Sequence, residues 1–137
     1  MSIEIDHIGI AVNSLDQRTP FWVALGLIMG EDEDLPNDQV IARFFSTTGK
    51  SEFPPRIELL QSTSPESPIA RFIEKRGEGI QQIAFRVENI GDTIRILQEN
   101  GVEMIDKTPR IGAHGSMIAF VHPKSTGGVL VEIVQRT

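Results

Sequence analysis

Cysteine and tyrosine are both missing from this chain of 137 residues. The lack of cysteine excludes disulfides, thiolate metal sites and cysteine nucleophiles, and the lack of tyrosine excludes a tyrosine acid or base. No run of lysine or arginine is longer than a dipeptide, and 19 acidic residues outnumber 13 basic ones. Nucleic acid is therefore not an expected partner. No apolar stretch approaches the roughly 20 residues that a membrane-spanning helix needs, so no membrane partner is expected either.

The composition is that of a folded domain, with 39% hydrophobic residues and only 8 prolines and 12 glycines. At this length we expect one compact domain over residues 1–137. The apolar start Met1–Ile5 is followed at once by Asp6, which is not the pattern of a secretory signal peptide. We therefore expect a cytoplasmic protein.

An internal repeat organises the chain. The segment Asp6–Leu15 reads as a strand that runs into a helix start, and Gln81–Ile90 has the same pattern about 75 residues later. A second pair, Ile57–Gln61 and Val131–Gln135, matches at nearly the same offset. Two matched pairs in the same order predict a duplicated module.

Alternation and capping residues predict the elements of each module. The fold class that follows is α+β, with two βαβββ modules forming a curved, half-closed mixed sheet. The first module covers about 3–63, a linking helix covers 67–76, and the second module covers about 80–135. In chain order we expect a strand at 3–12, a helix at 15–25, an acidic loop at 31–38, strands at 40–46 and 55–61 around a hairpin tip at 47–54, the linking helix, a strand at 81–87, a helix at 90–100, and strands at 102–105, 116–121 and 128–135.

The repeat selects four equivalent polar positions, one on the first and one on the last strand of each module: His7, Glu58, Gln82 and Glu132. If a pseudo-twofold axis brings the two sheets together, these side chains converge. One imidazole, two carboxylates and one amide oxygen suit Co²⁺, Mn²⁺, Ni²⁺, Mg²⁺ or Zn²⁺. The alternative is that both glutamates face solvent and that His7 is an ordinary surface histidine.

Three segments carry a family resemblance: Ser67–Ile80 (SPIARFIEKRGEGI), Pro109–Gly115 (PRIGAHG) and His122–Glu132 (HPKSTGGVLVE). On these motifs the chain resembles the methylmalonyl-CoA epimerase family of the vicinal oxygen chelate superfamily, which also includes glyoxalase I and bleomycin-resistance proteins. The resemblance covers nearly the whole chain. It implies a homodimer and a divalent metal ion, with Co²⁺ favoured, on the same four positions that the repeat selects.

The resemblance also implies a reaction: epimerisation at C2 of methylmalonyl-CoA or a similar acyl-CoA, through a metal-stabilised enolate. Glu132 is then expected to serve as one of two acid–base groups. The sequence departs from the family at two places. Gln81-Gln82 stands where the family usually has two histidines, and Asn37 stands where it has a glutamate base. Asp38 is the best local substitute for that base, with Asp34 and Glu33 as further candidates.

Two loops are expected to contact substrate. Lys124, Ser125 and Thr126 lie in a glycine-rich loop suited to a carboxylate or phosphate, and Arg110 and His114 lie in a similar loop. The alternative for the first loop is a solvated hairpin, and for His114 a plain surface histidine. Two other functions compete with the epimerase: a glyoxalase-type isomerase on another substrate, and a binding protein that kept the fold and lost catalysis.

Overall fold

The computed structural model describes residues 3–47 and 55–136. They form two compact units: a first unit of residues 7–81, and a second unit of residues 82–136 with 3–6. Most of the expected hairpin tip at 47–54 lies outside the described residues. No helix in the described part of the chain is both long enough and apolar enough to span a membrane.

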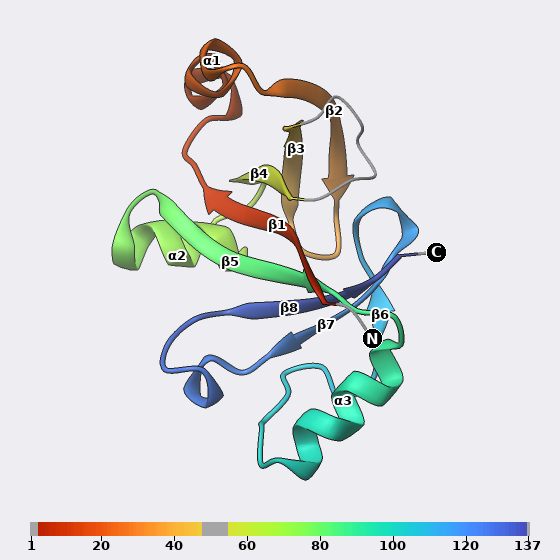
Figure 1. Ribbon diagram of the computed structural model, residues 1–137. Helices are drawn as coiled ribbons and strands as arrows, with labels where there is room; N and C mark the ends of the chain where they lie inside the picture. Colours follow the sequence, from red (N-terminus) through yellow and green to blue (C-terminus); the bar gives the residue numbers. More distant parts are fainter. Residues whose placement is uncertain (1–2, 48–54, 137) are drawn as a thin grey trace. The chain divides into compact units, whose positions relative to one another are not determined.

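The first unit contains one βαβββ module followed by the linking helix (Figure 1). Its strands lie in the order β2-β3-β4-β1, with β1 and β4 parallel and the other neighbours antiparallel. The core lies on one face of this sheet, where Phe45 and Leu59 pack against Leu15 and Trp22 of α1. The elements are β1 (Glu4–Ala11), α1 (Leu15–Leu25), β2 (Ile28–Leu35), β3 (Val40–Ser46), β4 (Arg56–Ser62) and α2 (Pro68–Arg76).

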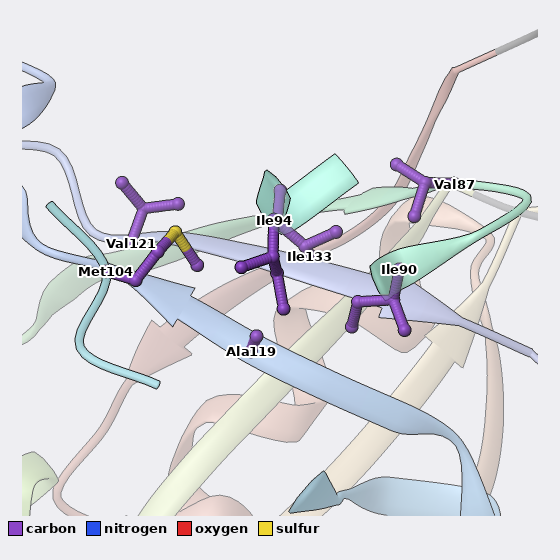
Figure 2. Close-up of a cluster of buried hydrophobic side chains, with 7 residues drawn as sticks. All are labelled: Val87, Ile90, Ile94, Met104, Ala119, Val121 and Ile133. Atoms are coloured by element: carbon purple, nitrogen blue, oxygen red, sulfur yellow. The ribbon is translucent and has the colours of Figure 1, made fainter. Parts of the chain in front are cut away.

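The second unit repeats this arrangement with strands in the order β5-β8-β7-β6. Strands β5 and β8 are parallel, and β7 is antiparallel to both of its neighbours. Figure 2 shows the cluster of seven buried side chains beneath its helix, with Ile90 and Ile94 facing Ala119 and Ile133. The elements are β5 (Gly79–Arg86), α3 (Ile90–Glu99), β6 (Arg110–Ile111), the 3₁₀ turns η1 (Ala113–Gly115) and η2 (Pro123–Ser125), β7 (Met117–Val121) and β8 (Val131–Gln135).

Equivalent hydrogen bonds occur in the two modules, which therefore share one local arrangement. In the first, the side-chain oxygen of Gln61 accepts from the backbone N–H of Leu15 at 2.8 Å. In the second, that of Gln135 accepts from Ile90, also at 2.8 Å. Each glutamine at the end of a module's last strand thus satisfies an unpaired N–H in the first turn of its helix. The expected pair of βαβββ modules is confirmed.

The prediction of an acidic loop at 31–38 is wrong for most of this segment. Strand β2 runs to Leu35, and only the turn after it lacks strand structure. A cross-strand partner explains the difference: Arg43 of β3 faces Asp32 and donates to both of its carboxylate oxygens, at 2.7 and 2.8 Å. These hydrogen bonds lower the pKa of the Asp32 carboxyl group. An edge strand tolerates acidic residues because both of its faces meet water.

The prediction of a strand at 102–105 is also wrong. Here the structure has only an isolated bridge between Met104 and Val121, and the strand that borders β7 is β6. The side chain of Asp106 accepts from the N–H of Phe120 at 2.9 Å, while the N–H groups of Ile105 and Asp106 both donate to the Phe120 carbonyl. An aspartate that bonds to the neighbouring backbone in this way competes with a regular ladder.

A buried carboxylate ties together the second unit. Asp6 is fully buried, and Arg136 approaches it with two hydrogen bonds at 3.0 and 2.7 Å. Arg86 adds a contact at 3.3 Å. The arrangement with Arg136 is the two-pronged geometry that makes arginine–carboxylate pairs strong. Both arginines keep part of their side chains in contact with water.

We expect Asp6→Asn to lower the free energy of unfolding by about 3 kcal/mol, the lower end for breaking a buried pair, because the arginines remain partly hydrated. Urea denaturation measures the loss. The matched control is Glu99→Gln, which removes an exposed pair with Arg95 at 2.7 Å and should cost about 0.5 kcal/mol or less. Equal losses in the two variants would contradict the buried role of Asp6.

Candidate functional site

Two polar side chains of the first unit face each other on the sheet surface away from α1. His7 of β1 and Glu58 of β4 are only 4% and 3% exposed, and His7 Nε2 lies 3.4 Å from Glu58 Oε1. Neighbouring positions on these strands, such as Ile57 and Leu59, belong to the core beneath α1. Strand alternation therefore directs His7 and Glu58 to the opposite face. The solvent-facing alternative for this pair is wrong.

The second unit carries the equivalent pair. Gln82 of β5 and Glu132 of β8 are 8% and 5% exposed, and the Gln82 amide donates to Glu132 Oε1 at 2.9 Å. Ile133, the next residue on β8, packs under α3 in the core cluster of Figure 2. The pair therefore lies on the face away from α3, and Glu132 is not a solvent-facing residue.

The donor types and the spacing of the first pair fit a divalent metal ion. Two nitrogen or oxygen ligands about 2.0–2.2 Å from a tetrahedral ion lie about 3.3–3.6 Å apart, close to the separation of His7 and Glu58. Within residues 3–47 and 55–136, no three histidine, cysteine, aspartate or glutamate side chains gather closely enough to hold an ion. Convergence of all four expected ligands on one ion therefore stays a prediction.

An aromatic ring and a buried arginine complete the polar face of the first unit. The ring of Phe44 meets that of His7 edge-on, with the centroids 6.3 Å apart. The Arg56 guanidinium lies 4.6 Å from the Phe44 centroid, and Arg56 is buried. Sequence reasoning missed Arg56. The signal that could have found it is its position two residues before Glu58 on the same strand, which places both on one face.

The loop expected to bind an anion makes many contacts within itself and with Glu103. The Lys124 ammonium lies 2.9 Å from the Glu103 carboxylate and lowers the pKa of that group. Ser125 Oγ accepts from the Glu103 N–H at 2.9 Å. The Thr126 hydroxyl contacts the backbone of Pro123 and Val129. The structure thus places Lys124 and Ser125 in the η2 turn that precedes β8, and Thr126 directly after that turn.

The other expected substrate contacts lie at the β6 end of the same unit. Arg110 lies 5.6 Å from the Phe120 ring centroid and 3.3 Å from Asp106. His114 is exposed within η1 and adopts a positive φ of 57°. This left-handed conformation is uncommon for residues other than glycine, and it places His114 at a sharp bend between β6 and β7.

The position of the expected second base is a tight turn between β2 and β3. Asn37 is exposed and Asp38 is half-buried, and the Asp38 N–H donates to Leu35 at 3.1 Å. The other two candidates differ in orientation. Glu33 pairs with Ala42 and so shares the face of Glu58, whereas Asp34 pairs with Ile41 on the α1 face. The geometry disfavours Asp34.

Comparison with known proteins identifies similar sequences. Residues 6–120 match the family model described as "Glyoxalase/Bleomycin resistance protein/Dioxygenase superfamily". An uncharacterized protein of Bacillus subtilis is 36% identical over 132 residues, covering 96% of this chain and 91% of that protein. The mitochondrial methylmalonyl-CoA epimerase of Bos taurus is 32% identical over 133 residues, covering 96% of this chain and 73% of that protein.

Solved structures confirm the fold class. A hypothetical protein of Bacillus halodurans matches with a TM-score of 0.93 at 45% identity, over 100% of this chain and 96% of that one. The methylmalonyl-CoA epimerase of Mycobacterium tuberculosis matches with a TM-score of 0.90 at 36% identity, over 97% of this chain and 87% of that one. A Streptomyces coelicolor methylmalonyl-CoA epimerase variant in complex with 2-nitronate-propionyl-CoA matches with a TM-score of 0.90 at 32% identity. The match covers 98% of this chain and 94% of that one.

Proposed function

Since the chain belongs to the glyoxalase/bleomycin resistance protein/dioxygenase superfamily, we propose that it is an epimerase of methylmalonyl-CoA or of a similar 2-substituted malonyl-CoA. One observation carries this proposal: epimerases match the chain over almost its full length, and all four polar positions that the repeat selects are buried on the sheet faces away from the helices. A CoA thioester is then its small-molecule partner.

The four positions His7, Glu58, Gln82 and Glu132 are the proposed ligands of a divalent ion, with Co²⁺ first among Mn²⁺, Ni²⁺, Mg²⁺ and Zn²⁺. When bound, such an ion supplies a Lewis acid that stabilises negative charge on the thioester oxygen. The burial of the ligands favours this role, because electrostatic interactions are stronger where water is excluded.

The chain's own residues move the proton at C2. Glu132 is the proposed base on one side of C2, and Asp38 is the proposed acid on the other, because Asn37 has no basicity near neutral pH. Epimerisation needs both groups, since the proton removed from one side must be replaced from the opposite side. Arg110, His114, Lys124, Ser125 and Thr126 are proposed to contact the substrate. We also propose a cytoplasmic homodimer.

Exchange of the C2 proton tests the function directly. We expect the purified protein to exchange this proton of methylmalonyl-CoA with deuterium from D₂O, faster after Co²⁺ is added than after chelation. Proton NMR of the C2 signal, corrected for exchange without protein, measures the rate. An absence of exchange with every divalent ion named above would refute the proposal.

The two positions where the chain departs from the epimerase family favour a second function, which is binding of a CoA thioester without catalysis. Gln82 is a neutral amide that donates to Glu132, and the turn has Asn37 in place of a carboxylate. A protein with these residues could bind a CoA thioester without epimerising it. Tight binding of methylmalonyl-CoA with no exchange would identify this case.

A further inference from the structure

Helix α2 of the first unit carries three exposed cations, Arg71, Lys75 and Arg76. None of them forms an ion pair with another described residue, whereas arginines elsewhere in the chain do, as Arg18 does with Glu78. The chain as a whole has a net charge of −6. Helix α2 therefore presents a local positive charge on an acidic protein.

The three cations lie within one half of the helix circumference. Residues four apart are neighbours on a helix surface, so Arg71 lies beside Lys75. The guanidinium of Arg76 lies over the Phe72 ring, 5.7 Å from its centroid. The Arg71 guanidinium donates to the Glu66 carbonyl at 2.7 Å, which restricts its position. A guanidinium that stacks on a ring makes its hydrogen bonds at its edge, where an anion can meet it.

The helix dipole explains only part of this distribution. Lys75 and Arg76 lie in the last turn, where the negative end of the dipole favours cations. Arg71 is the fourth residue of the helix, close to the positive end, where the dipole does not favour a cation. The one carboxylate within α2, that of Glu74, forms no ion pair with a described residue. A ligand with several negative charges would interact with all three cations.

The position of α2 suits one part of a CoA thioester. The helix packs against β4, the strand that carries Glu58. A thioester whose acyl group lies at Glu58 extends through its flexible pantetheine arm to a nucleotide with a diphosphate and a 3′-phosphate. These phosphates are strongly hydrated and suit an exposed surface. They also bring negative charge to an acidic protein, so local cations are needed to attract them.

We propose that Arg71, Lys75 and Arg76 bind the phosphates of the CoA nucleotide. This inference rests on the proposed function, because the CoA thioester is the ligand named there. The two arginines offer planar forks that match phosphate oxygens, and the lysine offers a point charge. Lys124 of the η2 turn is less suited to this role, because the Glu103 carboxylate already lies 2.9 Å from its ammonium group.

Two thioesters with the same acyl group test the inference. Methylmalonyl-CoA and methylmalonyl-pantetheine, which lacks the nucleotide, are titrated against the wild type and the double variant Lys75→Gln/Arg76→Gln. Calorimetry at low salt gives the ratio of the two Kd values. We expect the wild type to prefer the CoA thioester, and the double variant to reduce this preference about 3- to 30-fold, as for two exposed charge pairs. Binding of the pantetheine thioester should not change.

Three further variants complete the experiment. The double variant Arg95→Gln/Lys107→Gln removes the same charge from exposed positions of the second unit and should leave the preference unchanged. Arg71→Gln should reduce the preference about two- to fivefold, and it leaves the last turn of α2 intact. Lys75→Arg/Arg76→Lys keeps both charges and should keep most of the preference. Circular dichroism checks that each variant is folded.

The outcomes separate this inference from the proposed function. A preference that falls in the double glutamine variant of α2 and in Arg71→Gln, but not in the second-unit control, supports the role of α2, even if the wild type shows no C2 exchange. An unchanged preference in these α2 variants overturns it, even if exchange proceeds. An equal fall in the control also overturns it, because net charge alone would then explain the effect. A wild type that binds neither thioester contradicts both proposals.

Discussion

Glu132→Gln is expected to abolish exchange of the C2 proton of methylmalonyl-CoA. The substitution removes a candidate base and a negatively charged metal ligand from one buried position. Loss of a general base alone lowers the rate about 10²–10⁴-fold, so the variant should fall to the rate measured without protein. Glutamine has nearly the same shape as glutamate and can still bond to Gln82, so we expect the fold to persist. Circular dichroism checks this.

The repeat supplies the matched control. Glu58 is the equivalent residue of the first unit, and Glu58→Gln removes a ligand charge without removing the proposed base. We expect a higher Co²⁺ concentration to restore exchange in Glu58→Gln but not in Glu132→Gln. Restoration by metal in both variants would show that Glu132 is a ligand only. If folded Glu132→Gln exchanged the C2 proton at the wild-type rate, Glu132 would not be part of the site.

Asn37→Glu is expected to raise the exchange rate, by up to about 10²–10⁴-fold, because it places a carboxylate at the position where the family resemblance implies a glutamate base. Asn37 is exposed in the turn between β2 and β3, so a longer side chain fits without disturbing the core. The matched control is Asn37→Gln, which adds the same length without a basic group. The measurement is again the C2 exchange rate at saturating substrate.

Asp38 decides how large this gain is. If Asp38 already serves as the second acid–base group, Asp38→Asn should cause a large loss and Asn37→Glu only a small gain. In a protein that binds without catalysis, neither variant would show exchange. If the wild type is active while Asp38→Asn is harmless and Asn37→Glu changes nothing, the second group is not in this turn.

The sequence alone was enough to predict the modular fold. The repeated strand-and-helix starts, the capping residues and the glycines after the helices are local signals. The structure confirms the three helices that they mark, with N-caps at Ser14, Ser67 and Asn89. The repeat also selected the four polar positions now found buried. These predictions succeeded because short-range patterns determine where a helix begins and which strand positions are equivalent.

The edges of the sheets depended on partners distant in sequence. Strand β2 is acidic and exposed, and it pairs with β3, where Arg43 binds Asp32. The segment around Met104 has strand-like residues, but the Asp106 side chain bonds to the backbone of β7 instead. In both places a tertiary contact overrode the local pattern.

The sequence by itself determined the duplicated βαβββ design and the polar residues that alternate with its core. Only the tertiary structure decided which side of each strand is closed to water. Alternation separates the two faces of a strand, but burial depends on what packs against each face. His7, Glu58 and Arg56 are buried because of that packing.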